Sequence, residues 1–238
     1  MTCNALEWQV AAGGGRIIER DRTISVNNPA AIQAWQRARR WIGWISPPSV
    51  VASREVDSMR VFDSGRAAFN RIWFLTPMTR TGQARQIGWR SSIPVVKTGF
   101  SRMPAGAGGS VGTLGGTGTA ISSHSTHRQE AIAFLRFQLR ALMQSGEKDS
   151  GSGGPMQTEF SDPPSIAEPY VSATESNQRA SIAARPSVAA GSTYKQVSKA
   201  YIDTVHSVLI GERGAPEAAA ELEKQLIEIT GFSTGPPK

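Results

Sequence analysis

The spacing of apolar residues limits the folds open to this chain more than any other feature. From Thr193 to Gly211, and again from Pro216 to Gly231, apolar residues recur every three or four positions, as on a helix with one buried face. These positions are Val197, Tyr201, Val205, Val208, Leu209, Ala219, Leu222, Leu226 and Ile229. We therefore expect two amphipathic helices, each ended by its glycine.

The first half of the chain predicts two further helices. Asn28 followed by Pro29 is typical of a helix start, and Ser46-Pro47-Pro48 is typical of a helix end. The apolar stripe of this helix is Ile32, Trp35, Ile42 and Ile45, and Trp35, Trp41 and Trp44 are expected to pack inside the protein. A shorter helix is expected from Ser53 to Gly65, with Val56, Met59 and Phe62 inward.

A fifth helix is predicted from Thr126, which forms a capping box with Gln129. Its apolar face consists of Ile132, Leu135, Leu139 and Leu142, flanked by Phe134, Phe137 and Met143. Strand-like runs lie at Ala67–Leu75, Ser92–Val96 and Leu114–Ile121. This order of elements predicts an α/β protein, with helices flanking a mixed sheet.

The stretch 145–190 is irregular and rich in glycine, serine and proline. It is longer than compact domains usually leave without structure. Two interpretations stay open: short helices around Pro164–Tyr170 and Ser176–Ala184, or a disordered linker.

Composition excludes several classes of protein. A run of about 20 apolar residues, which a membrane-spanning helix needs, is absent. Cys3 is the only cysteine, so neither an internal disulfide nor a thiolate cluster is possible. The net charge of +7 admits nucleic-acid binding, but the arginines are scattered, which favours a solvated basic surface.

No catalytic or metal-binding pattern emerges. The glycine-rich segment 106–118 lacks the Lys-Ser/Thr ending of a phosphate-binding loop, so we expect a hairpin or loop there. His124 and His127 have no carboxylate or cysteine at metal-ligand spacing beside them, and His206 is expected on the surface of a helix. Glu221 and Glu223 are expected to be solvated. We expect neither an enzyme nor a cofactor.

Four motifs, in order, give a resemblance. They are Ile24–Ala31 after Gly13-Gly14-Gly15; Asp63–Asn70 followed by Trp73; Gly112–Ser122 followed by the Thr126 helix; and Arg185-Pro186 with Tyr194 and the two C-terminal helices. Together they resemble family 1 extracellular solute-binding proteins, the maltose- and trehalose-type sugar receptors of bacterial ABC importers.

The resemblance implies a fold, and it implies which part of the family's architecture this chain represents. It implies the periplasmic-binding-protein-like fold of type II, with residues 1–238 as the C-terminal part of a two-lobe protein. The architecture would then be incomplete, with much of the N-terminal lobe outside this sequence.

The resemblance also implies a ligand site and a mechanism. The ligand-binding residues it assigns are Trp73, Gly115, Gly116, Thr117, Arg185, Tyr194, Asn4, Glu7 and Trp8. Aromatic side chains would stack on a sugar while the two lobes close around it.

The implied partners are a small sugar and the membrane subunits of an ABC permease, with no nucleic acid. The implied location is the periplasm. Met1–Ala12 does not have the pattern of a secretory signal, so retention in the cytoplasm stays open as an alternative. Two other functions stay open: a non-functional remnant of such a receptor and a basic nucleic-acid-binding protein.

Overall fold

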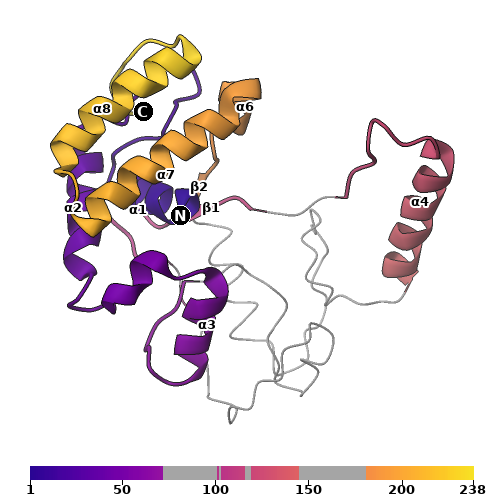
Figure 1. Ribbon diagram of the computed structural model, residues 1–238, viewed down its shortest axis with the longest axis horizontal. Helices are drawn as coiled ribbons and strands as arrows, with labels where there is room; N and C mark the ends of the chain where they lie inside the picture. Colours follow the sequence, from indigo (N-terminus) through magenta and orange to yellow (C-terminus); the bar gives the residue numbers. More distant parts are fainter. Residues whose placement is uncertain (72–100, 102, 116–118, 145–180) are drawn as a thin grey trace. The chain divides into compact units, whose positions relative to one another are not determined.

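The computed structural model describes residues 1–71, 101, 103–115, 119–144 and 181–238. Its elements, in chain order, are α1 (Thr2–Ala11), α2 (Pro29–Trp41), η1 (Pro48–Ala52), α3 (Glu55–Asp63), β1 (Val111–Thr113), α4 (Arg128–Gln144), β2 (Ser181–Ala183), α6 (Ser187–Ala190), η3 (Gly191–Thr193), α7 (Tyr194–Ile210) and α8 (Ala215–Thr230) (Figure 1). The chain forms two compact units. The first contains Met1–Ser58, Thr98–Leu114 and Asp162–Lys238, and the second contains Met59–Lys97 and Gly115–Ser161.

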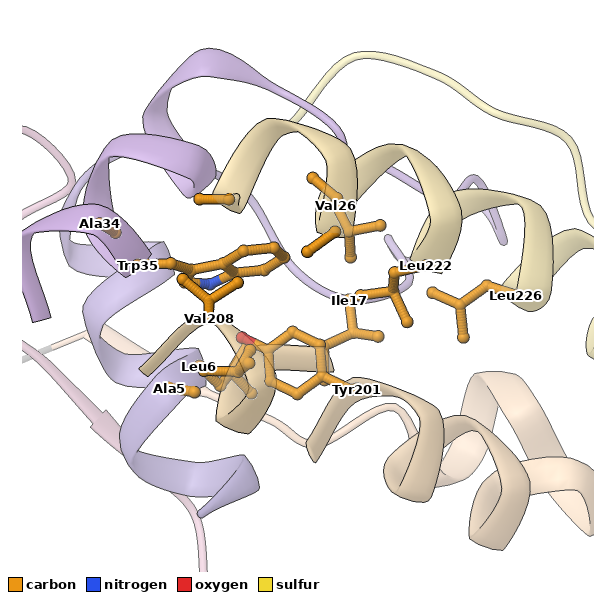
Figure 2. Close-up of a cluster of buried hydrophobic side chains, with 14 of the residues drawn as sticks. Ala5, Leu6, Ile17, Val26, Ala34, Trp35, Tyr201, Val208, Leu222 and Leu226 are labelled. Carbon is orange, nitrogen blue, oxygen red and sulfur yellow. The ribbon is translucent and has the colours of Figure 1, made fainter. Parts of the chain in front are cut away.

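Four helices of the first unit, α1, α2, α7 and α8, pack around one apolar core. Trp35 of α2 and Tyr201 of α7 meet edge to face, with ring centroids 6.0 Å apart. Leu6 of α1 and Leu222 of α8 are fully buried in the same cluster (Figure 2). Burying one such side chain stabilises a protein by about 1.5–3 kcal/mol, so this core is the main source of stability in the unit.

Two short parallel strands lie against α1. Val111 pairs with Ser181 and Thr113 with Ala183, and the Leu114 amide extends the ladder by donating to the Ala183 carbonyl. The segments that supply β1 and β2 are far apart in the sequence, as a parallel pair requires.

A glycine turn, residues 13–16, joins α1 to the segment before α2. The Gln9 side-chain amide donates to the carbonyls of Gly14, Gly15 and Arg16 at 3.1–3.2 Å. The Asn28 amide also donates to the Gly14 carbonyl, at 2.9 Å. Gly14 has no room for a side chain, because a Cβ there would lie 2.6 Å from the Ala31 nitrogen. The turn is therefore held by two buried amides.

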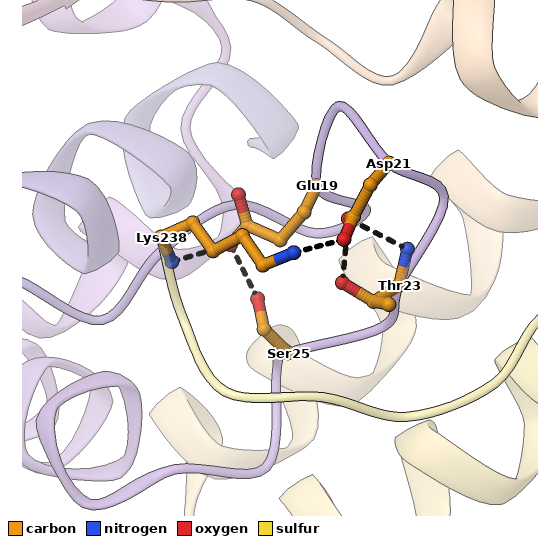
Figure 3. A network of polar contacts seen from close by, with 5 residues as sticks. All are labelled: Glu19, Asp21, Thr23, Ser25 and Lys238. Atoms are coloured by element: carbon orange, nitrogen blue, oxygen red, sulfur yellow. Dashed lines mark hydrogen bonds and ion pairs between the residues drawn. The ribbon is translucent and has the colours of Figure 1, made fainter.

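The last residues of the chain pair with a hairpin near its start. Ile24 bridges Ile18 in antiparallel and Thr234 in parallel orientation. Glu19, which is buried, accepts hydrogen bonds from the Ser25 hydroxyl at 2.6 Å and from the Lys238 amide at 3.4 Å (Figure 3). A hydrogen bond from the Lys238 ammonium is the main reason that the pKa of Asp21 falls from 3.8 to about 2.

Several predicted helix ends are confirmed. The Asn28 side chain accepts a hydrogen bond from the Ala31 amide, so it caps α2 as expected. Gly65, Gly211 and Gly231 follow α3, α7 and α8 with left-handed φ angles of 73°, 83° and 71°. The predicted core positions Val197, Tyr201, Val205, Val208, Leu209, Ala219, Leu222 and Leu226 are buried.

The end of α2 was predicted too late. The helix stops at Trp41, because Gly43 takes a left-handed φ of 82° and residues 41–46 form a closed turn. Ile45 is consequently exposed instead of continuing the buried stripe. The expectation that Trp44 packs inside is wrong, whereas Trp35 is fully buried.

Strand positions were also misplaced. The strand near Leu114 is β1, which ends at Thr113, and residues 114, 115 and 119–121 are not extended in a sheet. Residues 67–71 form no strand, and the rest of that run, like Ser92–Val96, lies outside the described residues. Ser181–Ala183 is a strand and not the end of a helix, because it pairs with β1.

The fifth predicted helix starts later than expected. The first residue of α4 is Arg128, and its first helical hydrogen bond joins the Ala131 amide to the His127 carbonyl. Phe134, Phe137 and Leu139, predicted to belong to an apolar face, are exposed. The glycine segment forms a tight loop as predicted, since Gly106 and Gly109 exchange backbone hydrogen bonds.

Replacing Gly14 with alanine should destabilise the first unit by about 1–3 kcal/mol, because the new methyl group overlaps the backbone of Ala31. Gly112→Ala is the matched control, since nothing lies within 4 Å of a Cβ there. Denaturant unfolding measures both variants. Equal stability of the two variants would show that the turn relaxes freely.

Tyr201 should make stability depend on alkaline pH. Burial raises its pKa above the ordinary value of 10.0, which outweighs the opposing effect of the Trp35 side chain. Its stabilising contribution is therefore complete below pH 10 and is lost as the pH rises further.

Tyr201→Phe should cost about 1–2 kcal/mol at neutral pH, because the hydroxyl donates to the Gln9 side-chain oxygen at 2.9 Å. The difference from the unaltered protein should shrink above pH 10, as urea titrations across that range would show. A constant difference at every pH would contradict this role of the hydroxyl.

Candidate functional site

The carboxyl ends of the two parallel strands define one edge of the first unit. Leu114 directly follows β1, and Ala184 and Arg185 directly follow β2. In open α/β sheets, ligands bind outside the carboxyl ends of the strands. We call this end of the strands the carboxyl edge.

The first turn of α1 lies at the carboxyl edge. The Thr113 hydroxyl donates to the Cys3 carbonyl at 3.0 Å, which places the start of α1 beside the end of β1. On the other side, the hydroxyls of Thr2 and Ser198 are 3.1 Å apart, which places the same turn beside the start of α7. Asn4, a predicted ligand-binding residue, is half-buried in this turn.

Glu7 connects α1 to β1. Its side chain is only 2% exposed, and its Oε1 atom accepts a hydrogen bond of 2.8 Å from the Thr113 amide. This bond satisfies a backbone donor at the point where β1 ends. Glu7 therefore positions the strand end, and its predicted contact with ligand stays a prediction.

Tyr194 and Arg185 approach the same edge from the chain after β2. Arg185 is exposed, two residues beyond β2. Tyr194 is the first residue of α7 and is half-buried, packed against the edge of the core. It lies one helical turn before Ser198, the residue that meets Thr2.

Trp8 faces a different neighbour. Its ring meets Trp41 of α2 edge to face, with centroids 5.8 Å apart. This contact places it at the junction of α1 and α2. The predicted residues Trp73, Gly116 and Thr117 lie outside the described residues.

Of the predicted residues, Asn4 and Glu7 therefore lie in the helix beside the end of β1, Arg185 lies two residues beyond β2, and Tyr194 begins α7. Gly115 belongs to the second unit. Sequence reasoning missed Thr2 and Ser198, whose hydroxyls join α1 to α7. It also missed Gln9, although a polar residue on the apolar side of α1 indicates a buried hydrogen bond. The edge offers hydroxyls, an amide, a guanidinium and an aromatic ring, which suit binding to a polar solute.

Within the described ranges, no three His, Cys, Asp or Glu side chains gather where they could hold a metal ion. None of the helices there has the length and apolar character that crossing a bilayer demands. An open surface depression on α8, lined by Arg213, Glu217 and Lys224 among others, shares no residue with the carboxyl edge.

A protein of Deinococcus radiodurans is similar to this chain over almost the whole of the chain. The sequence is 33% identical over 235 residues, 97% of this chain, to a Deinococcus radiodurans protein named "Probable ABC transporter-binding protein". The chain spans 54% of the length of that relative. No protein-family model matches the sequence.

Solved structures show the same fold. One of them is maltose-bound MalE3 of T. maritima, which superposes on this chain with a TM-score of 0.72 at 24% identity. The match covers 95% of this chain and 57% of MalE3. An ABC transporter solute-binding protein from Agrobacterium radiobacter K84, in complex with ribitol, matches 94% of this chain and 56% of its own with a TM-score of 0.67 at 18% identity. An ABC substrate-binding protein from Listeria monocytogenes, in complex with cycloalternan, has a TM-score of 0.61 at 14% identity. That match covers 98% of this chain and 58% of the Listeria chain.

The fold is thus that of the periplasmic-binding-protein-like receptors, over part of their two-lobe architecture. Within that fold, the sequence is similar to one protein named as a probable ABC transporter-binding protein, which agrees with the resemblance of its motifs.

Replacing Glu7 with alanine should lower stability by about 1–3 kcal/mol, because the buried Thr113 amide loses its acceptor. Glu7→Gln should cost less, since an amide oxygen can accept the same bond. The exposed Glu221→Ala on α8 serves as the control. Thermal unfolding measures all three variants, and an unchanged Glu7→Ala protein would mean that the end of β1 does not depend on this bond.

Proposed function

We propose that this chain supplies part of the ligand-binding cleft of a solute-binding component of an ABC import system. The observation that carries the proposal is the 33% identity with an ABC transporter-binding protein, sustained over 97% of the chain. The carboxyl edge supports it, because α/β proteins bind ligands outside the carboxyl ends of their strands and the first turn of α1 lies beside the end of β1.

The proposed ligand is a sugar or polyol. Three proteins of the same fold have maltose, ribitol or cycloalternan bound, and all three ligands are rich in hydroxyl groups. At the carboxyl edge, Asn4 and Arg185 would bind hydroxyls, and Tyr194 would lie against the apolar C–H face of a sugar ring. Trp73, Gly116 and Thr117 would complete the site.

The proposed mechanism is binding followed by closure. A solute held by two lobes favours the closed arrangement over the open one, and the closed form would then dock on the permease subunits in the membrane. This cycle needs neither a covalent step nor a cofactor. The proposed place of action is the outer side of the cytoplasmic membrane, where such importers receive their solutes.

Calorimetric titration with maltose, ribitol and longer oligosaccharides tests the proposal. One class of solute should bind with a one-to-one ratio and be recovered unchanged. Tyr194→Ala should weaken binding about tenfold, because the stacked ring is lost, whereas Tyr194→Phe should bind nearly as well.

The same pair of substitutions at Trp73 gives an independent check. Trp73→Ala should weaken binding, and Trp73→Phe should retain most of it. If a cooperatively unfolding sample produced no heat with any polyhydroxylated solute, the proposal would be wrong. Equal affinities of the alanine and phenylalanine variants would remove stacking from the mechanism.

A further inference from the structure

Residues 41–48, which we call the tryptophan loop, expose large apolar side chains between α2 and η1. Trp44 is 81% exposed and Ile45 is 64% exposed, and Val50 of η1 is also exposed. Scattered apolar residues are common on protein surfaces, but adjacent tryptophan and isoleucine side chains at one turn are a concentrated patch. No residue of the proposed solute site belongs to this loop.

Every backbone amide from Ile42 to Ser46 donates a hydrogen bond to a carbonyl of the protein. The amides of Trp44, Ile45 and Ser46 all donate to the Trp41 carbonyl, at 2.9–3.2 Å. The Gly43 amide donates to the Ser46 carbonyl and the Ile42 amide to the Arg39 carbonyl, and Pro47 and Pro48 have none. The main obstacle to burying backbone in lipid is the loss of hydrogen bonds between amides and water. The amides of this loop are already bonded within the protein, so the loop can leave water without that loss.

Both ends of the tryptophan loop are fixed to the first unit. At its start, Trp41 packs against Trp8. Beyond its end, the Val51 carbonyl lies 3.3 Å from the His206 ring nitrogen of α7. The exposed side chains are therefore presented by an anchored turn, so little conformational freedom is lost when they bind.

The chain segment that contains the loop carries positive charge only. Between Asp21 and Glu55 the chain carries five arginines and no acidic residue. Arg39 donates to the Val208 carbonyl, whereas the side chains of Arg37 and Arg40 are exposed on the last turns of α2. These two lie three residues apart and so share one side of the helix that leads into the loop.

We propose that the tryptophan loop docks this protein on an anionic lipid bilayer, with Trp44 and Ile45 in the interfacial region and Arg37 and Arg40 on lipid phosphates. Tryptophan favours the interface between hydrocarbon and headgroups, and flanking arginines add attraction to anionic lipids. The charge of the segment favours lipid over a second copy of this basic chain, because two copies would bring like charges together.

Cosedimentation with vesicles tests the proposal directly. The protein should bind vesicles of mixed phosphatidylcholine and phosphatidylglycerol more tightly than phosphatidylcholine alone, and its tryptophan emission should shift to shorter wavelength. Trp44→Ser with Ile45→Ser should weaken binding about tenfold or more, since the inserted apolar area is lost. Arg37→Gln and Arg40→Gln should each weaken binding about fivefold.

Val188→Ser is the matched control, because Val188 is 93% exposed on α6 and lies outside the loop. It should bind vesicles as the unaltered protein does, and circular dichroism should show that all variants are folded. If the Trp44/Ile45 double variant bound as tightly as the control, attraction would come from net charge alone and the proposal would be wrong. Self-association that the double variant abolishes, without vesicle binding, would likewise overturn it and identify the loop as an interface between copies.

Discussion

The first unit depends on two buried amide side chains that hold a glycine turn. Gln9 belongs to α1 and Asn28 caps α2, and both donate to the carbonyl of Gly14. Their hydrogen bonds fix the turn between the two helices, while the Gln9 oxygen accepts from Tyr201 of α7. Unpaired buried amides would cost more than the bonds contribute, so the helices have little freedom to pack in another register. Because α1 also bonds to the end of β1, the same hydrogen bonds help to fix the position of the carboxyl edge.

Sequence patterns located α2, α3, α4, α7 and α8 because their signals are local, whereas no pattern predicted α1 (Thr2–Ala11). Asn28 with Pro29, and glycines at the ends of α7 and α8, act within one turn of backbone, and the structure uses them as expected. The strands were misplaced because a three-residue strand has no periodicity of its own. β1 and β2 exist through pairing with each other and through the bond from Thr113 to Glu7, which are contacts between distant segments.

The candidate site was predictable only in part, for a related reason. The resemblance selected Asn4, Arg185 and Tyr194, which the fold brings toward one edge. It did not reveal Thr2 and Ser198, whose importance comes from α1 crossing beside α7. The expected burial of Trp44 failed because helical periodicity was extended beyond Trp41, where Gly43 reverses the chain. The spacing of apolar residues cannot reveal that a tryptophan is exposed on a turn, because the exposure depends on how the chain folds around it.

The first unit is assembled from three separate stretches of chain, and this has a consequence for biosynthesis. Helices α1 and α2 leave the ribosome long before α7 and α8, which complete the core that they share. Trp35 and Leu6 therefore stay accessible to water until the last third of the polypeptide has been synthesised and can cover them. Such non-local assembly is slow and prone to aggregation, so nascent chains of this protein would benefit from a chaperone that shields the early helices.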